Sequence, residues 1–180
     1  MIKIILFRGG FAGDLITALH NMNCFQKLTP EGKIEIDRDL LVLQGDSKDM
    51  TIEDKDRYLD KHPIISCCDP EFALKHSNKT LMITCDDAFM ATYFCKRFYQ
   101  YHPYIADDLS LEEYNTSFNQ WNHYWSSKFK KTIDLSDIFT NDSFLSKLDI
   151  VLDDDKIKLF NNWKEINQKS FLVHKDTYGQ

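Results

Sequence analysis

The stretch that decides the fold is Ile2-Lys-Ile-Ile-Leu-Phe-Arg-Gly-Gly-Phe-Ala-Gly-Asp-Leu-Ile16. Its first part, residues 2–7, is short, apolar and rich in β-branched side chains, which predicts a buried strand. Three of the six glycines in the chain follow it, at Gly9, Gly10 and Gly13. Apolar residues then recur at helical spacing across 14–24. A strand, a glycine turn and a helix in this order are typical of the start of a βα unit.

The same alternation continues along the rest of the chain. Strands are expected within 32–44 and over 64–68, 80–84 and 132–135. Helices are expected over 51–61, 69–76, 88–101, 110–125, 143–150 and 154–169. This pattern predicts one α/β domain over residues 1–180, three-layered, with a mostly parallel sheet, helices on both faces and a tail at 171–180.

Several expected helices begin at recognisable capping residues. Asp69 stands before Pro70, and Asp86 and Asp87 stand before the helix at 88–101. The segment Ser110-Leu-Glu-Glu113 has the form of a capping box. Because ligands of parallel sheets bind beyond the carboxyl ends of the strands, the polar turns at 8–14, 66–69 and 84–87 are expected to meet at one edge.

The charge balance limits the partners of this chain. Its net charge is −6, with 28% charged residues. Binding along a nucleic-acid backbone needs a basic surface, so the composition argues against it. Lysine far outnumbers arginine, and aspartate outnumbers glutamate, which is typical of an AT-rich coding genome such as that of a virus or phage.

The cysteines and the first residues indicate the compartment. The five cysteines are an odd number and form no CxxC pair, which argues against a disulfide framework or a zinc ribbon. The apolar run at the N-terminus is too short for a signal peptide or a membrane span. We therefore expect a cytoplasmic protein that does not enter a membrane, in the host cytoplasm if the protein is viral.

The glycine turn has the properties of an anion-binding loop. Glycines leave backbone N–H groups accessible, a helix N-terminus adds a partial positive charge, and Arg8 can add a fork of donors. Compared with a Walker A loop aligned on Gly13, however, Asp14 replaces the lysine and Leu15 replaces the Ser/Thr. A tight structural turn, with Asp14 as a helix cap, remains the alternative.

Four stretches together resemble one known family. They are Phe7-Arg-Gly-Gly-Phe-Ala-Gly-Asp-Leu-Ile16, Ile64-Ile-Ser-Cys-Cys-Asp-Pro70, Thr80-Leu-Met-Ile-Thr-Cys-Asp-Asp87 through Arg97-Phe98, and Thr132-Ile-Asp-Leu-Ser-Asp-Ile-Phe139 with Trp163. The sequence is similar to the P-loop sulfotransferase-like proteins, especially short viral and bacterial members. In that family the loop after the first strand holds the 5′-phosphosulfate of the donor PAPS, and the third stretch holds its 3′-phosphate.

The resemblance implies a set of cofactor-binding residues in this chain. Thr84 stands about where the family has an arginine for the 3′-phosphate, Thr92 stands where it has a serine, and Arg97 can supply the missing charge. Cys67 or Cys68 stands where many members have a catalytic histidine. The implied set for PAPS or adenosine 3′,5′-bisphosphate is Arg8, Gly9, Gly10, Phe11, Ala12, Gly13, Asp14, Thr84, Thr92 and Arg97.

Three functions follow as expectations. The first is a sulfotransferase-like domain that binds a phosphate-bearing nucleotide and transfers sulfuryl to a hydroxyl acceptor, with no assigned catalytic base beyond the distant candidates His20 and Asp69. The second is a P-loop-like fold without catalysis, serving as a binding or structural protein of a virus. The weakest is a divergent nucleotide kinase.

The remaining groups of polar, cysteine and aromatic residues are interpreted mainly as structural. No metal site is predicted, because the paired aspartates stand at expected helix starts. Cys67 and Cys68 follow an apolar run and are expected in the core rather than as a nucleophile. The aromatic segments could form a protein-partner surface, with Tyr99, Tyr101 and Trp125 expected to be the most exposed.

Overall fold

A computed structural model describes residues 1–8, 12–37, 42–43, 51–61, 64–101, 110–141 and 143–178. Its main sheet has five strands in the order β4-β5-β1-β6-β7. Every neighbouring pair in this sheet is parallel. The strands are β1 (Ile4–Leu6), β4 (Val42–Leu43), β5 (Ile65–Cys67), β6 (Thr80–Thr84) and β7 (Thr132–Asp134).

Strand β1 is the centre of the molecule. Ile4 pairs with Ile65 of β5 on one side and with Thr80 of β6 on the other. All three residues of β1 have no exposed surface. Successive side chains of a strand point to opposite faces, and accordingly Ile5 joins one hydrophobic cluster while Ile4 and Leu6 join another. This is the three-layer arrangement that the alternating sequence predicts.

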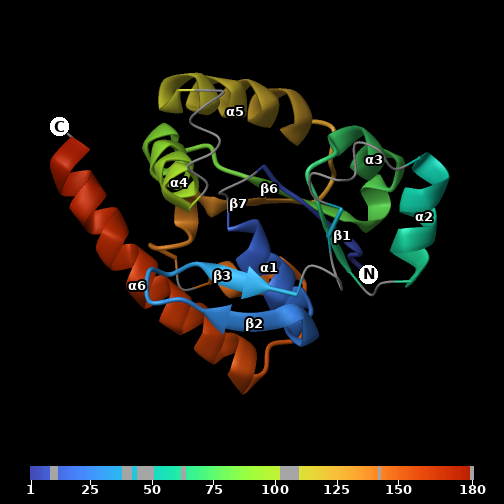
Figure 1. Ribbon diagram of the computed structural model, residues 1–180, viewed down its shortest axis with the longest axis horizontal. Coiled ribbons are helices and arrows are strands. Elements are labelled where there is room, and N and C mark those ends of the chain that lie inside the picture. Colours follow the sequence, from blue (N-terminus) through green and yellow to red (C-terminus); the bar gives the residue numbers. More distant parts are fainter. Residues whose placement is uncertain are drawn as a thin grey trace.

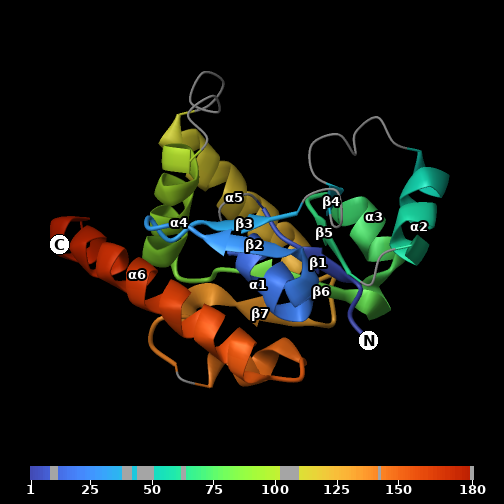
Figure 2. The same cartoon turned by 60° about the horizontal axis from the view of Figure 1, so that its bottom comes forward.

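Helices cover both faces of the sheet. The larger cluster contains residues of α1 (Gly13–His20), α4 (Ala88–Tyr101) and α6 (Asp154–Tyr178). The smaller cluster contains residues of α2 (Ile52–Lys61) and α3 (Pro70–Lys75). Figure 1 shows α2 and α3 together at the right, and Figure 2 shows α6 running along the lower side of the molecule.

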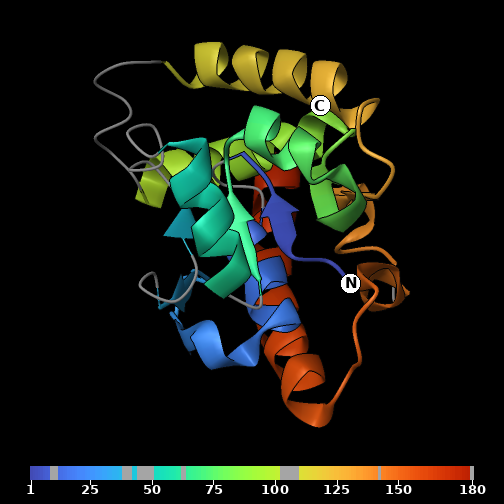
Figure 3. The same cartoon turned by 90° about the vertical axis from the view of Figure 1, so that its right-hand side faces the viewer.

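Helix α5 (Leu111–Ser126) lies beside α4 and spans both clusters. Its Phe118 is fully buried in the larger cluster, while Trp125 packs against the smaller one. Figure 3 shows α5 lying across one end of the molecule. The expected capping box is confirmed: Ser110 accepts a hydrogen bond from the Glu113 amide, and the Glu113 carboxylate accepts one from the Ser110 amide.

A two-stranded antiparallel hairpin lies outside the main sheet. It pairs β2 (Phe25–Leu28) with β3 (Ile34–Ile36) and follows the 3₁₀ turn η1 (Met22–Cys24). The sequence predicts strands within 32–44, and β3 and β4 both fall there, but they belong to different sheets. Strand β2 was not predicted, because its residues are half-buried or exposed and show no apolar alternation.

Asn167 of α6 attaches this hairpin to the rest of the fold. Its side-chain nitrogen donates to the carbonyl oxygens of Gly32 and Trp163, both at 3.0 Å. Gly32 has a φ of +84°, and a Cβ there would lie 2.4 Å from that nitrogen, so both the turn and the contact require glycine. The hydroxyl of Tyr93, on α4, donates to the Asn167 carbonyl at 3.0 Å.

Two expectations near the C-terminus are wrong. The segment 143–150 forms a 3₁₀ helix, η7 (Phe144–Leu148), rather than an α-helix. Helix α6 continues to Tyr178 and replaces most of the expected tail at 171–180, because Phe171 and His174 are buried against the fold. Among the described residues, no helix has both the length and the apolar character needed to cross a bilayer.

Replacing Phe171 by alanine tests the packing of the last turns of α6. Its ring packs against Phe139 and Tyr93, with centroids 5.2 and 5.3 Å apart. Truncating a buried phenylalanine costs about 3–5 kcal/mol. We therefore expect Phe171→Ala to lower the free energy of unfolding by that order, measured in urea. The neighbouring Leu172→Ala is the control, because Leu172 is 50% exposed and should change stability little. Equal effects of the two substitutions would contradict the docked helix.

Candidate functional site

Three polar turns meet at the carboxyl edge of the main sheet. Because β5, β1 and β6 are parallel neighbours, their ends lie side by side. Arg8 follows β1, Asp69 follows β5, and Asp86 follows β6. The structure therefore brings together the three turns that the sequence placed at one edge.

The connections after β1 and β5 leave the sheet on opposite sides. Helix α1 packs into the larger hydrophobic cluster through Leu15 and Ile16, whereas α3 packs into the smaller one through Phe72 and Ala73. In parallel sheets, ligands bind in the crevice where neighbouring strands send their connections to opposite faces. The fold thus creates such a position between the ends of β1 and β5, next to Arg8.

Only part of the glycine turn belongs to the described structure. Gly9, Gly10 and Phe11 lie outside the described residues. Ala12 precedes α1 with a left-handed φ of 50° and forms no side-chain cap. A Cβ on Gly13 would lie 2.2 Å from the ring of Phe7, which is buried in the core. Gly13 is therefore required for the close contact between strand and helix.

Asp14 occupies the first turn of α1. A carboxylate there is favoured by the partial positive charge of the helix N-terminus. The negative charge of the Asp14 carboxylate, however, repels a phosphate that approaches the first turn directly. Asp14 thus interacts favourably with the helix dipole, and an anion that binds beside it must overcome repulsion by its carboxylate.

The side chain of Arg8 is held by α5. Its guanidinium donates to the carbonyl oxygen of Ser117 at 3.0 Å and to the Ser117 hydroxyl at 2.7 Å. It also lies over the ring of Tyr114, 5.3 Å from the centroid. Burial raises the pKa of Tyr114, and the charge of Arg8 partly offsets this. The arginine is therefore fixed in position at the end of β1.

Helix α5 also holds the neighbouring strand end. The side-chain nitrogen of Asn122 donates to the carbonyl of Cys85 at 3.4 Å and to Asp86 at 3.2 Å. Neither Ser117 nor Asn122 was predicted to be a site residue. Their signal is a set of small polar side chains within an aromatic helix, at positions that face the protein rather than solvent.

The other predicted cofactor residues are used within the fold. The hydroxyl of Thr84 donates to the Ile133 carbonyl at 3.3 Å, and that of Thr92 donates to the Ala88 carbonyl at 2.9 Å. Arg97 contacts the Glu31 carbonyl of the hairpin and Ser170 of α6. The structure therefore does not bring Arg97 to the Arg8 turn, where the resemblance implied a common ligand.

The candidate catalytic groups are also buried or occupied by hydrogen bonds within the fold. Burial raises the pKa of the Cys67 thiol to about 12, which disfavours the nucleophilic thiolate. Asp69 caps α3 through the Glu71 and Phe72 amides and accepts from Lys55 at 2.6 Å. Although desolvation opposes it, these hydrogen bonds lower the pKa of Asp69. A carboxylate occupied in this way is poorly suited to act as a general base.

His20 lies at the end of α1 far from Arg8, because α1 begins at the carboxyl edge and runs for eight residues, about 12 Å. Burial lowers its pKa to about 4, with Asp149 opposing the shift and Lys156 adding to it. His20 is thus a neutral imidazole at pH 7 and stands apart from Arg8.

The acidic pairs act as caps and turn acceptors. Asp87 accepts from the Met90 amide at 2.7 Å and caps α4. Asp134 accepts from the amides of Asp86 and Ser136, at 3.1 and 3.0 Å. Within the described part of the chain, no three His, Cys, Asp or Glu side chains gather as a metal site.

The exposure of the aromatic side chains differs from the prediction. Tyr99, Tyr101 and Trp125 are half-buried, whereas Tyr124 is 57% exposed. Lys128 lies 4.3 Å from the Tyr124 ring centroid. Tyr124, rather than the three named residues, is therefore the most exposed of these rings.

No family model, curated protein or solved structure matches the chain.

Gly13→Ala tests whether the glycine is needed for packing. The added methyl would meet the buried Phe7 ring, and overpacking of a core costs about 1–3 kcal/mol. We expect a loss of that order in denaturant unfolding. Ala12→Gly is the adjacent control and should not destabilise the fold, because glycine adopts the left-handed conformation without strain. A Gly13→Ala protein as stable as the wild type would contradict the close contact.

The pKa of His20 predicts a pH dependence of stability. Its folded value of about 4 lies below the unfolded value of 6.5, so the unfolded chain binds more protons between these limits. This contribution is complete above pH 6.5 and is lost as the pH falls toward 4. We expect His20→Gln to lose less melting temperature than the wild type between pH 7 and pH 5. Equal losses in the two proteins would contradict burial of a neutral His20.

Proposed function

We propose that this protein is a sulfotransferase-like domain that binds a phosphate-bearing nucleotide, such as PAPS or adenosine 3′,5′-bisphosphate, at the carboxyl edge of its sheet. The observation that carries the proposal is the position of Arg8. It follows the central parallel strand, at the point where α1 and α3 leave on opposite faces of the sheet. Its hydrogen bonds to Ser117 hold a permanent positive charge at that point.

The surroundings of Arg8 suit a phosphate group. Guanidinium binds phosphate through paired, charge-assisted hydrogen bonds, and its five N–H donors exceed the two that Ser117 receives. Helix α1 begins five residues after Arg8 and presents its N-terminus at the same edge. Prior fixation of the side chain reduces the entropy that binding must overcome.

The described side chains at this edge favour binding over transfer. Asp69 is occupied by a helix cap and by Lys55, and the thiol of Cys67 is protonated. Thr84 donates to a backbone carbonyl of β7. With these groups committed to the fold, the proposal is a nucleotide-binding protein, and sulfuryl transfer is not part of it.

Nucleotide-dependent stabilisation tests this proposal. A ligand at 100 times its Kd should stabilise the folded state by about 2.7 kcal/mol. We expect adenosine 3′,5′-bisphosphate and PAPS to raise the melting temperature. We expect Arg8→Gln to weaken the affinity at least about tenfold, because the charge-assisted hydrogen bonds of the guanidinium are lost. Arg57→Gln, at an exposed arginine of α2, is the matched control and should bind normally. No shift with millimolar nucleotide, or equal affinity in Arg8→Gln, would overturn the proposal.

Asp14→Asn determines how the phosphate is accommodated. If the phosphate meets the first turn of α1 directly, removing the carboxylate charge should strengthen binding, and added Mg²⁺ should have little effect. This is the outcome we expect, measured by calorimetry with adenosine 3′,5′-bisphosphate. Weaker binding in Asp14→Asn, together with a requirement for Mg²⁺ in the wild type, would instead show that a cation bridges Asp14 and the ligand.

A further inference from the structure

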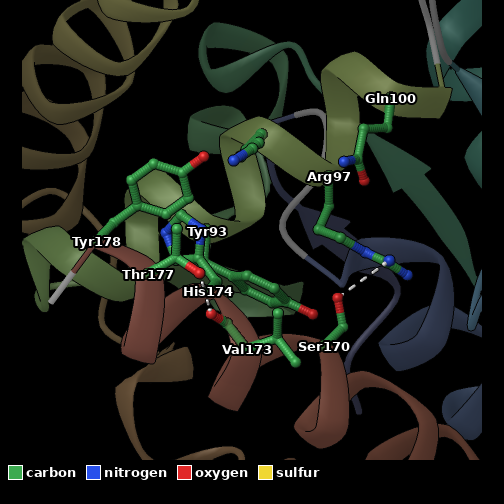
Figure 4. Close-up of a pocket in the computed structure, with 9 residues that line it drawn as sticks. Tyr93, Arg97, Gln100, Ser170, Val173, His174, Thr177 and Tyr178 are labelled. Atoms are coloured by element: carbon green, nitrogen blue, oxygen red, sulfur yellow. Dashed lines mark hydrogen bonds between the residues drawn. The ribbon is translucent and has the colours of Figure 1, made fainter.

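A cavity lies away from the carboxyl edge, between α4 and α6. Its volume is about 230 Å³, which corresponds to roughly eight liquid water molecules at ~30 Å³ each. Figure 4 shows the labelled side chains around it. The lining residues are Tyr93, Lys96, Arg97, Gln100, Ser170, Val173, His174, Thr177 and Tyr178.

The lining is positively charged although the chain as a whole is acidic. Lys96 and Arg97 both line the cavity, and none of the nine lining residues is an aspartate or glutamate. The chain carries a net charge of −6, so two cations without a lining carboxylate stand out from the rest of the composition. Such a cavity attracts an anion.

Arg97 is held rigidly at one side of this cavity. Its guanidinium donates to Ser170 at 3.4 Å and to the side-chain oxygen of Asn167 at 3.1 Å, and it also contacts the Glu31 carbonyl. All of these acceptors are neutral. These hydrogen bonds therefore place the positive charge of Arg97, and the carboxylate of Glu31, which interacts with this charge, does not line the cavity.

His174 provides an independent indication of a ligand. Its side chain is 92% buried, and its Nε2 has no hydrogen-bond partner among the described residues. Burial, with a smaller contribution from Lys96, lowers the pKa of His174, so the ring is neutral at pH 7. A buried polar nitrogen that lines a cavity is costly unless an occupant supplies the missing hydrogen bond.

Aromatic rings form the remaining wall. The His174 ring lies 4.9 Å from that of Tyr178 and 5.6 Å from that of Tyr93. Lys96 lies 4.0 Å from the Tyr178 ring centroid. Flat apolar faces next to two cations complement a molecule that has both a ring and a negative group.

From this arrangement we infer that the α4–α6 cavity binds a small aromatic phosphate monoester, with the phosphate between Lys96 and Arg97 accepting a hydrogen bond from His174 Nε2, and the ring against Tyr178. The site is separate from the nucleotide site proposed at Arg8, because its residues come from Tyr93 to Gln100 of α4 and from the last turns of α6. Its failure would leave the proposed function untouched.

Phenyl phosphate is the probe for this site. We expect saturable binding by calorimetry, with changes in the NMR signals of the His174 ring that locate the ligand. Lys96→Gln should weaken binding about tenfold or more, because it removes a charge-assisted contact. Lys175→Gln is the matched control on α6, since Lys175 does not line the cavity, and should bind within about twofold of the wild type.

Three further results decide the assignment. Tighter binding of phenyl phosphate than of inorganic phosphate supports the aromatic wall, and equal binding overturns it. Absence of phenyl phosphate binding at 10 mM overturns the site. Arg8→Gln should bind phenyl phosphate normally, and loss of binding in that variant would assign the ligand to the carboxyl edge instead.

Discussion

The burial of β1 is the constraint on which the rest of the structure depends. The strand is hydrogen-bonded to a parallel neighbour on each side, and its three residues have no exposed surface. The chain that leaves β1 can therefore continue only beyond the carboxyl edge of the sheet. Arg8 is placed there by this necessity, and Gly13 follows because α1 must return tightly over Phe7.

Helix α5 fixes the positions of the residues at the carboxyl edge of the sheet. It binds the end of β1 through Ser117 and the end of β6 through Asn122. In a sheet of this type the carboxyl edge is the usual place for a ligand, so a helix that fixes the residues there also fixes the geometry that a ligand meets. Thr92 accepts a hydrogen bond from Asn115 of α5 and is therefore part of the packing between α4 and α5.

The sequence predicted those features that depend on local pattern. The buried strands, the Asp69 cap and the Ser110 capping box all have signals within a few residues. The extent of α6 was missed although its buried residues continue at helical spacing through Phe171 and His174, because polar residues occupy two of the buried positions. Arg8 was placed correctly at the strand end, but its partner Ser117 lies 109 residues away, and only the tertiary fold brings the two together.

The contact between Gly32 and Asn167 has a consequence for how the chain folds. The two residues are 135 positions apart, so the carbonyl of the hairpin turn finds its partner only after the middle of α6 has emerged from the ribosome. Pairings of such long range are slow to form, because a large loop must be closed first. The hairpin is synthesised among the first elements and packs on α1, yet the hydrogen bond from Asn167 that supports its turn forms only after most of the chain has been made.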